Sequence, residues 1–215
     1  MSQVTAGASL QANTRLFSKP FVGKFKYEFT NVETGSDQRP YSESHKILLG
    51  GLFHLTENQS SGIYTQMRKD DFEYEGFEPV ISSRDADRVE AGLTYSFHSE
   101  DNKTGLDWKL AYEENRAMGL NFNRTAYKAG VTLRLPLVAQ WNMRLSIDYE
   151  DHEYSDFVGP VMRVTEIYQY SLAFTCRFGK HLFARLRVSE RDEESSYANL
   201  TYDRITWGLD LSYVY

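Results

Sequence analysis

The sequence predicts an all-β protein, an antiparallel up-and-down transmembrane β-barrel of about ten strands, and three observations lead to this prediction. Apolar residues recur at every second position over long stretches, and no helical period competes with them. Short and long connections alternate between these stretches. Aromatic residues make up 14% of the chain although its mean hydropathy is -0.54, as expected for strands with one apolar and one polar face.

The expected strands follow one another from Pro20 to the end of the chain. No run of about 18 apolar residues occurs, which excludes a helical membrane protein. Strands of about ten to fourteen residues are longer than is usual in soluble sheets and match what crosses a bilayer when tilted. The outward apolar sets lie in the ranges 21–29, 47–55, 63–67, 89–97, 106–112, 127–135, 141–149, 168–178, 182–188 and 205–215.

Residues 1–19 are an N-terminal periplasmic segment or an extra strand, before a barrel domain over residues 20–215. Val4, Leu10 and the alanines between them alternate with polar residues, so an eleventh strand fits this region. Bacterial barrels have even strand numbers. We therefore expect ten wall strands from Pro20, with a twelve-stranded barrel lacking one strand as the alternative.

The connections predict which end of the barrel faces which compartment. Short links are typical of the periplasmic end and long loops of the extracellular end. The chain ends on the short-link side, so its C-terminus is expected to be periplasmic. The short links are 56–60, 99–104, 136–140 and 179–181, and the long segments are 31–44, 73–87, 115–124, 151–163 and 192–200.

The last nine residues have the pattern of a closing barrel strand. The residues of the expected membrane insertion signal, which barrel assembly machinery would recognise, are Trp207, Leu209, Leu211, Tyr213 and Tyr215. Aromatic residues at the ends of other strands predict interfacial belts. These features predict the bacterial outer membrane, with lipid and lipopolysaccharide around the barrel. Met1–Leu10 does not resemble a signal peptide, so a mature form or a fragment is expected. A soluble barrel or sandwich with its apolar face inside is the rival interpretation.

The polar positions between the outward sets predict what lines the lumen. Five arginines are expected at similar depth, as a basic patch in the periplasmic half: Arg134, Arg144, Arg177, Arg185 and Arg187. The acidic lumen residues are Asp107, Asp148, Glu150 and Asp210. The patch could attract anions, as arginine rings do in anion-selective pores. An internal network of salt bridges is the other interpretation, because the interior of a ten-stranded barrel is narrow.

The sequence gives little indication of a nucleic-acid, metal, cofactor or catalytic site. The net charge of -6 argues against nucleic-acid binding, and Cys176 alone forms no disulfide and fits an apolar filler on an outward face. No metal-ligand spacing or cofactor motif occurs, so none is expected. Asp151, His152 and Ser155 form a nominal hydrolase set, but Asp151 and His152 should point to opposite faces of a strand. A protein without enzymatic activity is therefore expected.

The C-terminal third resembles a known group of proteins. The residues that carry the resemblance are Arg191-Asp192, Ser195-Ser196, Tyr202-Asp203-Arg204 and 207–213. Together they are similar to the closing hairpin of Gram-negative outer-membrane β-barrels linked to the export of polysaccharide or surface proteins, although those barrels commonly end in Phe. The resemblance implies a porin-like or export-associated conduit. The alternatives are a closed structural barrel that anchors an envelope complex or presents acidic loops to a partner protein, and an outer-membrane lipid hydrolase.

Overall fold

The computed structural model describes residues 2–34, 39–72, 83–100, 104–138, 140–159, 161–179 and 182–213. They form an all-β fold. Its strands are β1 (Ser2–Leu16), β2 (Lys19–Thr34), β3 (Arg39–His54), β4 (Gln59–Phe72), β5 (Ala86–His98), β6 (Gly105–Ala117), β7 (Arg124–Pro136), β8 (Trp141–Tyr154), β9 (Arg163–Phe178), β10 (Leu182–Ser195) and β11 (Tyr202–Tyr213). Two short 3-10 helices, Leu120–Phe122 and Ala198–Leu200, lie in the connections. Neither is long and apolar enough to cross a membrane.

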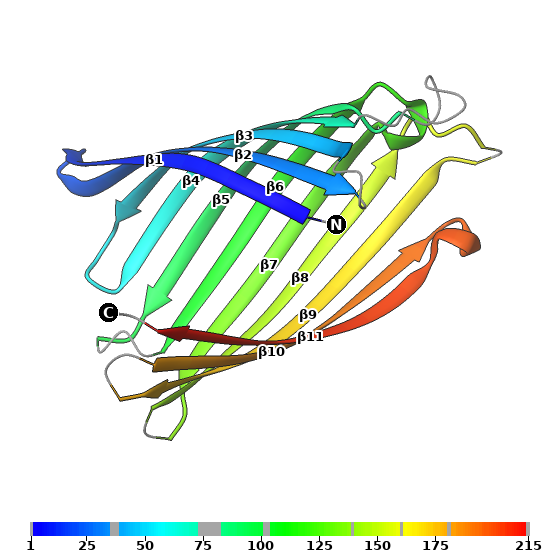
Figure 1. Ribbon diagram of the computed structural model, residues 1–215. Helices are drawn as coiled ribbons and strands as arrows, with labels where there is room; N and C mark the ends of the chain where they lie inside the picture. The colour runs from blue at the N-terminus through cyan, green and yellow to red at the C-terminus, as the bar shows by residue number, and fades with distance from the viewer. Residues whose placement is uncertain are drawn as a thin grey trace.

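All eleven strands belong to one sheet, in which each strand pairs antiparallel with the next in sequence. The sheet curls about its own axis, so that β1 and β11 lie on opposite sides of an open seam (Figure 1). Among the described residues no ladder joins β1 to β11. The up-and-down antiparallel order agrees with the sequence prediction, and within the described part of the chain the two edge strands, β1 and β11, each pair with one strand only.

The strand count of eleven corrects the expectation of ten. Residues 1–19 contain β1, which pairs with β2 from Ser2 to Leu16 without interruption. The two strands are joined by a turn at Phe17 and Ser18, whose φ angles of 50° and 62° are those of a tight hairpin with positive φ at both central residues. A two-residue turn of this kind fixes the register of β1. The alternation that made the segment ambiguous in the sequence is therefore that of a sheet strand.

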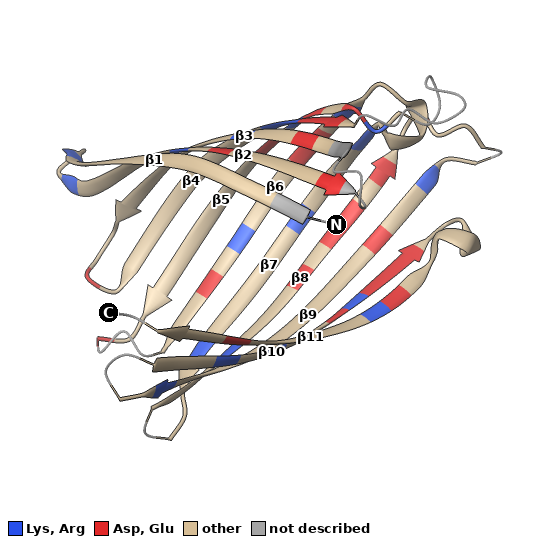
Figure 2. Cartoon of the chain, in the orientation of Figure 1, with Lys and Arg blue, Asp and Glu red and all other residues tan. Residues whose placement is uncertain are grey.

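The long polar connections are shorter than expected because several strands continue into them. β8 extends to Tyr154 and β10 to Ser195, well into the segments 151–163 and 192–200. The ladder uses backbone N–H and C=O groups, which every residue except proline carries, so it can continue where both faces have become polar. The acidic residues in Figure 2 include several near the heads of the β8 and β10 arrows, at this end of the sheet.

The two faces of the sheet differ in chemistry. Large apolar side chains are exposed on the outer, convex face, for example Leu93 opposite Leu110, which are 57% and 52% exposed. The inner face carries nearly all of the buried residues, and many of them are polar, such as Glu113 and Thr165. The described residues therefore form no apolar core of the usual kind. Cys176 lies on the outer-face register beside Trp141, as expected, but is buried.

Candidate functional site

A row of residues at one depth brings most of the predicted basic patch together on the inner face. The register places Arg134 opposite Arg144, Arg144 opposite Ala173, and Ala173 opposite Arg187. Arg185 lies two residues from Arg187 on β10, on the same face. Because these partners sit side by side on adjacent strands, four of the five arginines are concentrated on β7, β8 and β10.

A second row, two residues further along each strand, consists of short hydroxyl side chains. In register order from β7 to β11 they are Thr132, Ser146, Ser171, Ser189 and Thr206. The Thr132 and Ser146 hydroxyls lie 3.0 Å apart, and those of Ser189 and Thr206 lie 2.7 Å apart. Small side chains next to long arginines leave space above the sheet, which explains why a pocket forms here.

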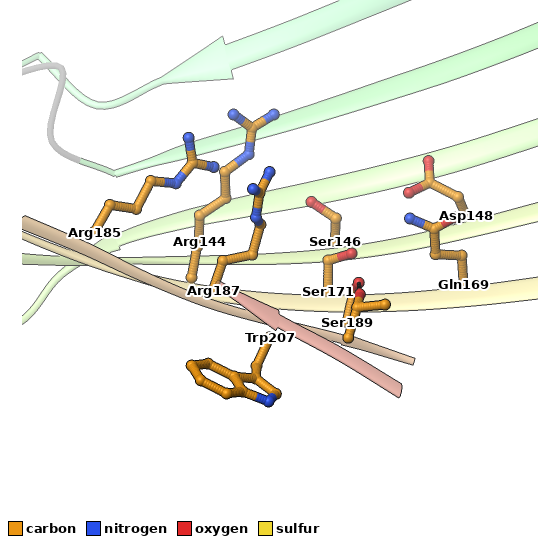
Figure 3. Close-up of a pocket in the computed structure, with 11 residues that line it drawn as sticks. Arg144, Ser146, Asp148, Gln169, Ser171, Arg185, Arg187, Ser189 and Trp207 are labelled. Carbon is orange, nitrogen blue, oxygen red and sulfur yellow. Dashed lines mark hydrogen bonds between the residues drawn. The ribbon is translucent and has the colours of Figure 1, made fainter. Parts of the chain in front are cut away.

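The pocket has a volume of about 460 Å³ and is lined from β8, β9, β10 and β11. Figure 3 shows Arg144, Arg185 and Arg187 projecting to the same side of the sheet, while the Trp207 ring lies on the other side. The hydroxyls of Ser146, Ser171 and Ser189, with Gln169 and Asp148, complete the polar lining. The pocket therefore places three guanidinium groups beside several neutral hydrogen-bonding groups and the carboxylate of Asp148.

The arginines of the patch are only partly neutralised. Arg134 is bound to Asp107 at 2.9 Å and lies 3.1 Å from His98 Nδ1, and Arg187 lies 3.9 Å from Asp210.

Within the described part of the chain, Arg144 and Arg185 have no ion pair, and Nε of Arg185 is buried without a hydrogen-bond partner. Asp148 makes no ion pair with them; its carboxylate lies over Gly130. The pocket thus retains positive charge.

The remaining predicted residues lie elsewhere. Arg177 is outside the pocket, because its Nε donates to the carbonyl of Gly179 at 3.0 Å and its guanidinium lies over the Phe183 ring. Glu150 binds His152 at 2.8 Å at the opposite end of β8. Trp207, Leu209, Leu211 and Tyr213 occupy the exposed outer face of β11, whereas Tyr215 lies outside the described residues.

A second charged cluster, on β4 to β7, was not predicted as a site. Its centre is Lys128, which donates to Glu90 at 2.8 Å and also binds Glu113. Lys109 donates to Glu90 at 3.0 Å, and Arg124 to Glu113 at 3.0 Å. Glu90 and Glu113 are only 5% and 1% exposed. The alternation in the sequence already places each of these residues on the inner face. Only the register between strands shows that the acidic and basic side chains lie next to one another.

The cluster continues toward β3 through Arg88 and Asp70. Arg88 lies 3.7 Å from Glu113 and 3.8 Å from Asp70. Asp70 also binds Arg68 at 2.6 Å and accepts a hydrogen bond from Ser44 at 2.5 Å. This chain of ion pairs crosses β4 to β7, and the Ser44 hydrogen bond connects it to β3. The sequence offered a salt-bridge network inside a barrel as one interpretation of the lumen charges, and the ion pairs observed here involve mostly other residues than those named for it.

Tyr64 is hydrogen-bonded to this network, and its ring also lies close to a glycine. Its Oη donates to Glu90 at 2.6 Å, and its ring lies across Gly92, where an added Cβ would be 2.5 Å from the ring atoms. We expect Gly92→Ala to displace Tyr64 and to cost about 1–3 kcal/mol of stability, as for other overpacked sites. Chemical denaturation would measure the loss. Gly208→Ala, where the nearest atom is 3.7 Å away, is the control that should leave stability nearly unchanged.

The nominal hydrolase set is not assembled. Asp151 has outer-face register and His152 inner-face register, as expected for neighbours on a strand. His152 is hydrogen-bonded to Glu150 instead, and its Nδ1 has no partner among the described residues. The described part of the chain contains no group of three or more His, Cys, Asp or Glu side chains that could hold a metal ion.

Comparison with known proteins does not assign the chain to a family. No protein-family model matches it, and no curated protein matches it.

Proposed function

We propose that this chain forms the wall of an outer-membrane β-barrel that acts as a conduit for anionic solutes. The observation that carries the proposal is the division of the sheet into an apolar outer face and a charged inner face. In a soluble barrel the faces would be reversed, with apolar side chains packed inside. Here Lys128 and Glu113 face inward, while Tyr112 and Tyr127 face outward beside them.

The dimensions of the outer apolar band support this proposal. On β9 the band runs from Tyr168 to Phe178, about 33 Å along the strand at about 3.3 Å per residue. A tilt of about 40° gives a height of about 25 Å, which matches the apolar band of outer-membrane barrels. The band is long enough to cover the hydrocarbon layer.

Aromatic pairs mark both borders of the band. At the end with the long connections, Tyr112 packs on Tyr127 with ring centroids 5.3 Å apart, and Tyr149 on Tyr168 at 5.0 Å. At the other end Phe21 packs on Phe53 at 4.8 Å and Tyr95 on Trp108 at 5.4 Å. Amphipathic rings prefer the headgroup level of a bilayer, so two such belts support a membrane-spanning sheet.

Closure of the barrel requires one more strand in this proposal. β1 and β11 are both odd-numbered strands of an antiparallel sheet and run in the same direction (Figure 1). Direct pairing between them would be parallel, whereas bacterial single-chain barrels are antiparallel and even-numbered. A twelfth strand between them satisfies both conditions, and it corresponds to the twelve-stranded alternative from the sequence.

Conduction is tested in planar lipid bilayers with the closed barrel purified from membranes, in which the twelfth strand is present. We expect discrete current steps with a preference for anions, because the patch around Arg185 and Arg187 retains positive charge. Replacing both arginines by Ser should shift the preference toward cations, as measured by the reversal potential in a salt gradient. Arg177→Ser, outside the pocket, is the matched control. A correctly folded protein that carries no current would contradict the conduit.

A structural barrel is the second candidate function. It is favoured by the ion-pair network on β4 to β7, which links buried groups such as Glu113 and Asp70, because side chains paired in this way occupy space inside the wall. A barrel with a blocked interior could still anchor an envelope complex or present its acidic loops to a partner. Capture of a specific envelope protein by a variant that is silent in bilayers would favour this function.

A further inference from the structure

Resting on the proposed conduit, we infer that the inner-face pocket is a binding site for the phosphate group of a small organic solute. Its three guanidinium groups come from two different strands and two depths: Arg144 from β8, and Arg185 and Arg187 from β10. All three project to the same side of the sheet (Figure 3). Such a site holds its ligand at a defined position, which general anion selectivity does not require.

The donor arrangement favours phosphate over a carboxylate. Each guanidinium has five N–H donors, and a planar carboxylate is satisfied by one guanidinium fork. A tetrahedral phosphate with two negative charges accepts hydrogen bonds from several directions and can engage three arginines together. Arg144 and Arg185 form no ion pair among the described residues, and Asp210 reaches Arg187 only at 3.9 Å. The Asp148 carboxylate also lines the pocket, so one negative charge faces the three guanidinium groups. The charge of the pocket therefore remains available to a ligand.

The hydroxyl row indicates what the phosphate is attached to. Ser171 and Ser189 line the pocket next to the arginines, with Ser146, Thr206 and the Gln169 amide. Hydroxyl and amide groups both donate and accept hydrogen bonds, which suits a polar, hydroxylated ligand body. The volume of about 460 Å³ lies in the usual range for small-molecule sites. A phosphorylated polyol fits this combination better than an apolar phosphate ester does.

The test is calorimetric titration of the same closed barrel in detergent at constant ionic strength, which keeps general charge screening the same. Inorganic phosphate, glycerol 3-phosphate and acetate are the probes. We expect one phosphate or glycerol 3-phosphate per protein, and acetate binding at least about tenfold weaker. Equal binding of acetate and phosphate would overturn the inference.

Variants separate the two parts of the pocket. Arg144→Gln with Arg185→Gln should weaken phosphate binding at least about tenfold, because charge-assisted hydrogen bonds are lost. Arg177→Gln, on the same face outside the pocket, should bind like the original protein. Ser171→Ala with Ser189→Ala should weaken glycerol 3-phosphate but not inorganic phosphate. An equal loss in Arg177→Gln would show nonspecific charge binding and overturn the site.

Folding and conduction are controlled separately. Circular dichroism reports whether each variant keeps its β-sheet; if the double arginine variant does not, Arg144→Gln alone replaces it, since Arg144 has no ion pair in the described chain. Binding in detergent does not depend on conduction. A protein that conducts anions but does not bind phosphate overturns this inference only, and one that binds phosphate but is silent in bilayers overturns only the conduit.

Discussion

Replacing Leu186 by Arg is expected to destabilise the protein in lipid by about 2–4 kcal/mol, provided that the position lies near the bilayer midplane. Leu186 is on the outer face, between Phe174 of β9 and Leu209 of β11, and is 45% exposed. In the proposed orientation its side chain contacts hydrocarbon, where a guanidinium has no water or counterion. Urea titration of the protein folded into lipid vesicles would measure the loss.

The matched control changes the residues on either side of Leu186. Arg185→Ser with Arg187→Ser should leave the protein folded, because both side chains point to the inner face and neither is held by a close ion pair. If the double Ser variant unfolded while Leu186→Arg were harmless, the two faces would be inverted. The membrane proposal would then be wrong.

Removing the carboxylate of Glu113 should give the other large effect, a loss of about 3–5 kcal/mol. Glu113 is 1% exposed and is shared by Lys128, Arg124 and Arg88. In Glu113→Ala these three cations lose a common partner and are left close together with less compensation. Denaturant unfolding of the refolded protein, followed by circular dichroism, would measure the change.

The neighbouring residue provides the control for this prediction. Glu114 has the opposite register and forms an exposed pair with Arg116 at 2.7 Å. Because water and salt screen exposed pairs, Glu114→Ala should change stability little. Similar losses in both variants would show that the network on the inner face does not stabilise the fold.

Strand positions and faces could be predicted from the sequence because they depend on local alternation. Leu93, Trp108 and Val131 face outward in the structure as their period-2 pattern predicts. The same parity identified inward residues such as Arg144 and Arg187. Local pattern could not assign β1, since an alternating segment of small residues reads equally well as a strand or as a tail until its pairing with β2 is known.

Depth and partner choice were decided only by the tertiary structure. The register places Arg134 beside Arg144, but Arg134 forms an ion pair with Asp107. Arg177 lies over the Phe183 ring, away from the pocket. The register also aligned a row of hydroxyls that lie far apart in the chain. Alternation determines the face on which a side chain lies, because it is a property of a single strand. Which charges meet depends on the stagger between strands, and that is a property of the whole sheet.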